Sequence, residues 1–169
     1  GAQKNLGPAG ATIYIVKESV LGKSTSKFMP SYFDLAKQHE KESMLNTPPV
    51  FAVYVCMLTL RWLKEQGGVA AIEKINDQKA ALLYDTLDSI PVFKPTVDKA
   101  DRSKMNVVFV MDNPELEKSF LELCKKEGMV GVKGHRSVGG FRVSLYNALP
   151  LSSVKTLVEV MQHFALKHA

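Results

Sequence analysis

Apolar positions that recur every three or four residues are the clearest pattern along this chain. Such spacing gathers apolar side chains on one face of a helix. It predicts three helices, over residues 69–87, 113–128 and about 153–165.

A fourth helix is predicted over residues 48–66, which are apolar on nearly every side. A helix of this composition is normally buried on most sides, so we expect more protein around it than a small domain supplies. Thr47 suits its N-cap, Pro48 its first turn and Gly67-Gly68 its end.

Short β-rich segments stand between these helices. They predict strands over residues 12–17, 91–94, 106–111, 129–132 and 141–146. Residues 68–169 therefore alternate as helix-strand-strand-helix-strand-strand-helix, which predicts a compact α/β unit with its own core. Residues 1–11 form a loop rich in glycine and proline, and residues 18–45 a long surface excursion of a length that is typical of functional loops.

Composition narrows the class of protein without choosing a function. Of the 169 residues, 46% are apolar and 23% are charged, which excludes a disordered tail, a collagen-like chain and a coiled coil. The net charge of +5 favours anionic partners, but it does not distinguish nucleic acid from phosphorylated metabolites or from an ordinary basic surface. Basic residues are not interleaved with aromatic ones as they are in single-strand binders.

The cysteines and the opening of the chain bear on its compartment. Cys56 and Cys124 lie in apolar or helical runs without zinc-ligand spacing, so we expect buried free thiols in a reducing compartment. The longest apolar run, residues 50–58, is too short to span a bilayer. The chain opens with neither a starting Met nor a signal-peptide pattern, so we expect a processed or excised chain.

Three segments carry candidate chemistry, and the first surrounds Lys4. This lysine lies between Gln3 and Asn5, ahead of a Gly-Pro-Ala-Gly turn. A lysine held in a tight loop can be desolvated and become a carbonyl nucleophile, whereas the alternative is a mobile terminal lysine. The loop lacks the residue order of a P-loop, which argues against triphosphate hydrolysis.

The second segment is Asn46-Thr47-Pro48-Pro49. The start of a helix offers unpaired N–H groups and a positive dipole end, and the Asn and Thr side chains add donors, so this segment can form a phosphate cup. Simple helix capping explains the same residues.

The third segment, residues 134–142, combines His135, Arg136 and Arg142 with three glycines. Glycine lets the backbone approach a ligand closely, and arginine binds carboxylate or phosphate with two parallel hydrogen bonds. On the predicted strand Arg142 lies opposite the apolar face, where it contacts either solvent or a substrate carboxylate. The sequence shows no Ser-His-Asp set, metal-ligand cluster or catalytic carboxylate pair.

The motifs GAQKNLGPAG, NTPP and KGHRSVGGFRVSLYNALP, in this order and spacing, resemble the phosphoserine aminotransferase family of class V pyridoxal-phosphate-dependent aminotransferases. The resemblance covers essentially the whole chain and implies an α/β protein of the aspartate aminotransferase-like fold type I. Residues 1–66 would be the C-terminal part of the large cofactor-binding domain, with the cofactor-linked lysine and a dimer-contact segment. Residues 67–169 would be the small C-terminal α/β domain.

The resemblance also implies how the cofactor, pyridoxal phosphate, is held. Lys4 would bind it covalently and move a proton during catalysis, and Gln3 would contact its phosphate. Asn46 and Thr47 would reach the cofactor phosphate of the neighbouring subunit in a homodimer with shared active sites. No metal is implied.

The substrate roles implied by the resemblance lie in the third motif. His135 and Arg136 would contribute to the site for the substrate phosphate, and Arg142 would hold the α-carboxylate. The reaction would be reversible transamination of 3-phosphohydroxypyruvate with glutamate to O-phosphoserine and 2-oxoglutarate, in serine biosynthesis. A cytoplasmic enzyme is implied, with neither nucleic acid nor membrane as a partner.

Members of this family are considerably longer, so the resemblance implies a partial enzyme. We expect this chain alone to bind the cofactor weakly, to show little activity and to expose apolar surface. Two alternatives stay open. One is another class V aminotransferase or a related lyase, and the other is a non-catalytic remnant or interaction domain.

Overall fold

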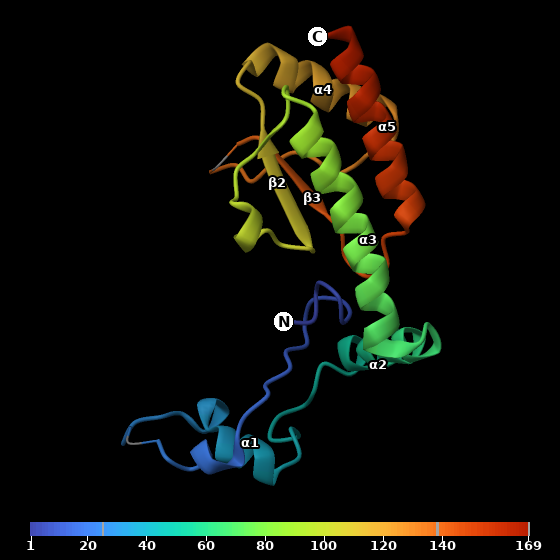
Figure 1. Ribbon diagram of the computed structural model, residues 1–169. Helices are drawn as coiled ribbons and strands as arrows, with labels where there is room; N and C mark the ends of the chain where they lie inside the picture. The colour runs from blue at the N-terminus through green and yellow to red at the C-terminus, as the bar shows by residue number, and fades with distance from the viewer. Residues whose placement is uncertain (25, 138, 169) are drawn as a thin grey trace. The chain divides into compact units, whose positions relative to one another are not determined.

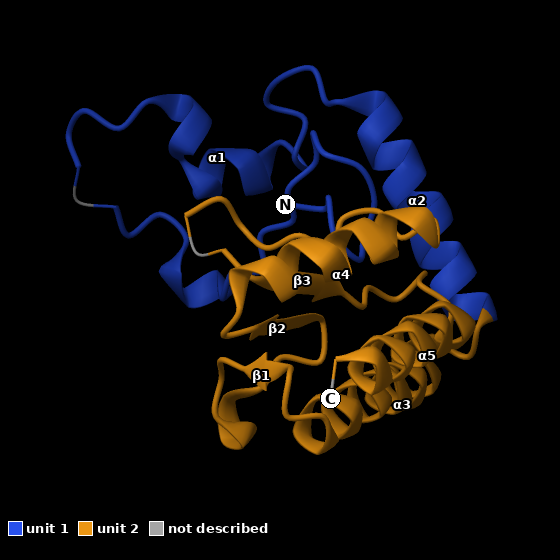
Figure 2. Cartoon of the chain, turned by 90° about the horizontal axis from the view of Figure 1, so that it is seen from above, with its two compact units in different colours: residues 1–65 blue, residues 66–169 orange. Residues whose placement is uncertain are grey.

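The computed structural model describes residues 1–24, 26–137 and 139–168, and the chain divides into two compact units, residues 1–65 and 66–169 (Figure 2). We call them unit 1 and unit 2 and describe each by itself. Within the described residues, no helix is both long enough and apolar enough to cross a membrane.

Unit 1 contains little regular structure. Its elements are the 3-10 helices Glu18–Val20 and Ser31–Phe33 and the α-helices α1 (Leu35–Glu40) and α2 (Val50–Glu65). Helix α1 begins where the Asp34 carboxylate accepts the backbone N–H groups of Ala36 and Lys37. These short helices lie in the stretch predicted as a surface excursion, where six helical residues are too few to produce a periodic pattern.

Two expectations for unit 1 are wrong. Residues 12–17 form no strand, because no described segment pairs with them, and Ile15 is 98% exposed. Helix α2 begins at Val50, so Thr47 is not its N-cap. The buried residues of this helix are Ala52 and Cys56, while other apolar side chains of its first turns are exposed, which agrees with the apolar surface expected of this chain alone.

Unit 2 is an α/β unit, as predicted. Its elements are α3 (Gly68–Ser89), β1 (Lys94–Pro95), the 3-10 helix Lys99–Asp101, β2 (Asn106–Val110), α4 (Pro114–Lys126), β3 (Phe141–Ser144) and α5 (Leu151–Lys167). The strands form an antiparallel sheet in the order β1-β2-β3. The three predicted helices and the strands at 106–111 and 141–146 are confirmed with small shifts, whereas the strand predicted at 91–94 begins only at Lys94.

The strand predicted at residues 129–132 is wrong. This segment does run beside β3, where Val132 O accepts the backbone N–H of Arg142 at 2.8 Å and Lys133 makes an isolated bridge to Phe141. Gly131 has a φ of +82°, which breaks the extended path that a strand requires.

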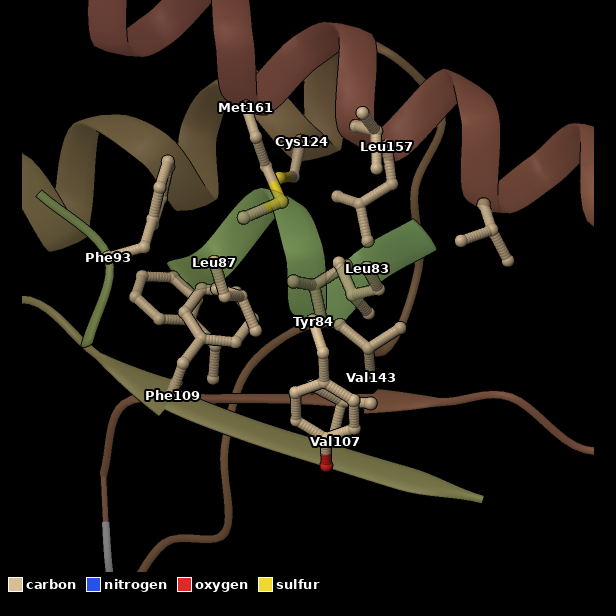
Figure 3. Packing of buried hydrophobic residues seen from close by; sticks show 14 of the residues in the cluster. Leu83, Tyr84, Leu87, Phe93, Val107, Phe109, Cys124, Val143, Leu157 and Met161 are labelled. Atoms are coloured by element: carbon tan, nitrogen blue, oxygen red, sulfur yellow. The ribbon is translucent and has the colours of Figure 1, made fainter. Parts of the chain in front are cut away.

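One face of the sheet forms the core of unit 2 with α3, α4 and α5 (Figures 1 and 3). Alternate residues of β2 and β3 point into this core, among them Phe109 and Phe141, whose rings stack 4.8 Å apart. Both cysteines are free and buried, as expected, and burial raises the pKa of the Cys124 thiol to about 11. The opposite face of the sheet, which includes Arg142, lies outside this core.

Candidate active site

The loop that carries Lys4 closes tightly on itself. Ala2 N donates to Ala11 O at 2.9 Å, and Ala2 O accepts the backbone N–H groups of Lys4, Leu6 and Gly7 at 2.6, 3.2 and 2.9 Å. A single carbonyl therefore fixes the turn on which Lys4 lies, while the lysine side chain itself is exposed. The Lys4 amine therefore lies on a hydrogen-bonded turn and not on an unstructured chain terminus.

Helix α2 supports this loop through its two buried residues. A Cβ on Gly7 would lie 2.7 Å from Cys56 Sγ, and a Cβ on Gly10 would lie 3.4 Å from Ala52 Cβ. Glycine at position 7 therefore allows the loop backbone to lie directly on the helix. The glycines that the sequence analysis placed in a turn thus have a packing role that sequence alone did not reveal.

The other predicted cofactor-binding residues of unit 1 are exposed. Gln3 lies beside Lys4 on the same loop, and Asn46 and Thr47 precede α2. A primary amine, two side-chain amides and a hydroxyl suit a phosphorylated carbonyl compound, because an amine reacts with a carbonyl and neutral donors bind phosphate. The donor set of unit 1 therefore fits pyridoxal phosphate.

The loop of residues 134–140 in unit 2 has a narrow, fixed base. Gly134 N donates to Gly140 O and Gly139 N donates to His135 O, each at 2.8 Å. A Cβ on Gly134 would overlap Gly139 O, and a Cβ on Gly140 would lie 2.7 Å from Phe109 O of β2. Glycine is therefore required at both ends of the loop.

The tip of this loop presents the predicted phosphate-binding pair. His135 and Arg136 are exposed, as is Ser137 beside them. His135 Nδ1 lies 2.7 Å from Ser137 Oγ and accepts the Ser137 backbone N–H at 3.3 Å. Both of these contacts of the imidazole are made through one ring nitrogen, Nδ1.

Arg142 lies on the open face of the sheet, as its position in the strand predicted. It pairs with Val108 in the register of β2 and β3, and its side chain is exposed. On the same face, Ser144 Oγ and Tyr146 OH each donate to Asn106 Oδ1 at 3.3 Å. These hydrogen bonds join the end of β3 to the start of β2 near Arg142.

A residue that the sequence analysis missed holds the loop after β3. Lys79 of α3 is fully buried, and its Nζ donates to the carbonyl oxygens of Leu145, Tyr146 and Leu149 at 3.1, 2.9 and 3.2 Å. Burial lowers the pKa of this lysine. One turn earlier, Asn76 Nδ2 donates to Asn147 Oδ1 of the same loop at 2.9 Å.

The predicted site residues thus form two groups. The cofactor group lies in unit 1 and comprises Gln3, Lys4, Asn46 and Thr47, and the substrate group lies in unit 2 and comprises His135, Arg136 and Arg142. Two guanidinium groups and an imidazole suit a substrate with a phosphate and a carboxylate. Across residues 1–24, 26–137 and 139–168, no cluster of three metal-ligating side chains occurs.

Comparisons with known proteins match nearly the whole chain. A family model described as aminotransferase class-V matches residues 1–157. The phosphoserine aminotransferase of Flavobacterium johnsoniae is 55% identical over 162 residues, which cover 96% of this chain and 45% of that protein. This chain therefore spans about half the length of the curated relatives it matches.

Solved structures give the same result. A phosphoserine aminotransferase from Bacillus circulans subsp. alkalophilus has a TM-score of 0.95 and 42% identity, over 100% of this chain and 47% of that one. A PLP-bound phosphoserine aminotransferase from Trichomonas vaginalis has a TM-score of 0.82 and 34% identity, over 87% of this chain and 42% of that one. These likenesses confirm the predicted fold.

Proposed function

Because the chain belongs to the class V aminotransferase family, we propose that it is the C-terminal part of a phosphoserine transaminase. The reaction is reversible transamination between 3-phosphohydroxypyruvate with glutamate and O-phosphoserine with 2-oxoglutarate. The observation that carries the proposal is that one chain has an exposed amine on a fixed loop, together with one histidine and two arginines on the strand β3 and on a second loop whose base is fixed.

Pyridoxal phosphate is the proposed cofactor, and when bound it supplies the electron sink for chemistry at the substrate α-carbon. Lys4 holds it covalently and carries a proton to and from that carbon. Gln3 donates to its phosphate. Asn46 and Thr47 reach the cofactor phosphate of a second subunit.

His135 and Arg136 bind the substrate phosphate in this proposal, and Arg142 binds its α-carboxylate. An arginine that binds an anion with two parallel hydrogen bonds orients it as well as attracting it. A substrate without the phosphate would leave His135 and Arg136 without their acceptor, so phosphorylated substrates are preferred.

The assignment of the units follows from the same proposal. Residues 1–66 complete the large cofactor-binding domain, and residues 67–169 form the small domain. The enzyme is a cytoplasmic homodimer that requires neither nucleic acid nor membrane. Its substrates are a small phosphorylated compound and glutamate.

A chimera tests this function in an enzyme of full length. The part of the Flavobacterium johnsoniae relative that this chain does not cover is joined ahead of Gly1, and transamination of O-phosphoserine is measured by coupled absorbance. We expect activity that Lys4→Ala abolishes. Arg136→Gln should lower kcat/KM for phosphoserine about 10- to 100-fold, because a charged hydrogen bond contributes about 1.5–3 kcal/mol.

Arg142→Gln is the matched variant for the second arginine and should impair both amino acids, since each has an α-carboxylate. A chimera that binds the cofactor and transaminates only unphosphorylated amino acids would contradict the proposal and favour another class V aminotransferase. A chimera that binds the cofactor without any transamination would favour the non-catalytic alternative.

A further inference from the structure

One ring nitrogen of His135, Nδ1, has two contacts, and both are with Ser137. Ser137 Oγ lies 2.7 Å from Nδ1, and the backbone N–H of Ser137 points at the same nitrogen from 3.3 Å. The backbone of His135 is also held, because its carbonyl accepts Gly139 N–H at 2.8 Å. Both the backbone and the ring of this histidine are therefore fixed by its own loop.

These contacts determine which ring nitrogen carries the proton. A backbone N–H can only donate, so the nitrogen that accepts it must have a free lone pair. If Nδ1 were protonated, its hydrogen would face the hydrogen of Ser137 N. The neutral imidazole is therefore the tautomer with the proton on Nε2, and the Ser137 hydroxyl donates to Nδ1.

We propose that Ser137 is a positioning residue that holds His135 as the Nε2–H tautomer and so directs a single N–H donor at the substrate phosphate. This inference rests on the proposed function, in which His135 and Arg136 bind that phosphate. Arg136 supplies the charge and the paired donors, and the imidazole supplies one directed hydrogen bond. Ser137 itself does not touch the substrate.

Nitrogen NMR of the 169-residue chain tests the tautomer directly. Two-bond correlations from the ring protons distinguish a protonated from an unprotonated ring nitrogen, and His135→Gln assigns the signals among the four histidines. The spectra are recorded above neutral pH, where free imidazole is neutral. We expect His135 to show an unprotonated Nδ1 and a protonated Nε2.

Two variants test the contribution of the Ser137 hydroxyl apart from that of the loop backbone. Ser137→Ala removes the closer contact, at 2.7 Å, and leaves Nδ1 with only the backbone N–H at 3.3 Å. The tautomer is then held less firmly, so the two ring nitrogens should move part of the way toward the averaged shifts of mixed tautomers. Ser137→Thr keeps a hydroxyl at the same position and should preserve the single tautomer. A protonated Nδ1 in the parent chain, or an unchanged ring spectrum in Ser137→Ala, would overturn the inference.

Titration with inorganic phosphate separates this inference from the proposed function. We expect phosphate to shift His135 Nε2, and Ser137→Ala to weaken that binding about three- to tenfold, the loss typical of one hydrogen bond. A fixed Nε2–H tautomer that phosphate does not perturb would support the positioning role of Ser137. The same result would count against phosphate binding by His135.

Discussion

Replacing Lys79 by Met tests how unit 2 holds the loop that follows β3. Methionine keeps most of the apolar stem but removes the ammonium group, which donates to three backbone carbonyls from a fully buried position. Tyr146 O retains a second donor, the backbone N–H of Leu149 at 2.9 Å. The loss is therefore concentrated on the carbonyls of Leu145 and Leu149.

The expected cost follows from these two carbonyls. A buried acceptor left without its donor costs about 1–3 kcal/mol, so two of them cost about 2–6 kcal/mol. The variant also avoids burying a charge, whose unfavourable desolvation is evident in the lowered pKa of Lys79. We expect Lys79→Met to reduce the free energy of unfolding by about 2–4 kcal/mol after this offset.

Urea unfolding followed by circular dichroism measures this difference, and Lys74→Met provides the matched control. Lys74 is exposed on the same helix, so its replacement should change stability by less than about 0.5 kcal/mol. Equal effects of the two substitutions would refute the reasoning, because they would mean that the carbonyl contacts of Lys79 add nothing to stability.

The pH dependence of stability gives a second measure of the same group. Burial lowers the pKa of Lys79 from its ordinary value of 10.5, so in the window between the two values the unfolded chain binds more protons than the folded one. The stability of the parent chain should therefore rise relative to that of Lys79→Met as pH increases through this window. A parallel pH profile for the two proteins would contradict it.

Two other substitutions test a loop and an ion pair. Gly7→Ala places a Cβ against Cys56, so it should reduce labelling of Lys4 by pyridoxal phosphate and borohydride severalfold, as measured by peptide mapping. Gly22→Ala is the control, because its Cβ meets open space and labelling of Lys4 should not change. Equal labelling of the two variants would refute this. Arg102 lowers the pKa of Asp88 to about 2 through a two-fold hydrogen bond, so Asp88→Asn should cost about 1 kcal/mol at pH 7. That difference should disappear as pH falls from about 4 toward 2 in urea titrations, because the Asp88 carboxylate becomes protonated; a difference that persists would refute it.

Patterns within one element could be predicted from sequence, and patterns that depend on a distant partner could not. The helical period predicted α4, because that signal lies inside the helix itself. Residues 12–17 have strand composition, but a strand also needs a partner that composition does not supply. Composition likewise indicates that α2 needs a cover but not what supplies it, and within this chain Val50, Phe51 and Tyr54 are exposed.

The candidate site divides in the same way. The order of residues in the family motifs identified Lys4 and Arg142. It did not reveal that the carbonyl of Ala2 fixes the Lys4 loop or that Ser137 contacts the His135 ring. A signal for Lys79 was present, because it shares a helical face with Ile72 and Leu83, which marks a lysine on an apolar stripe. Its partners lie 66 to 70 residues later in the chain and could not be inferred.

That separation in sequence has a consequence for folding. Helix α3 is made first within unit 2, yet Lys79 has its carbonyl partners only after Leu149 has been synthesised, and the core also needs Phe164 of α5. Loop closure over such distances is slow compared with helix formation, so local structure in α3 precedes its burial. We expect unit 2 to fold as a whole once α5 has left the ribosome. Until then, burial of α3 would place the charged Lys79 in a core that lacks its carbonyl partners or its last helix.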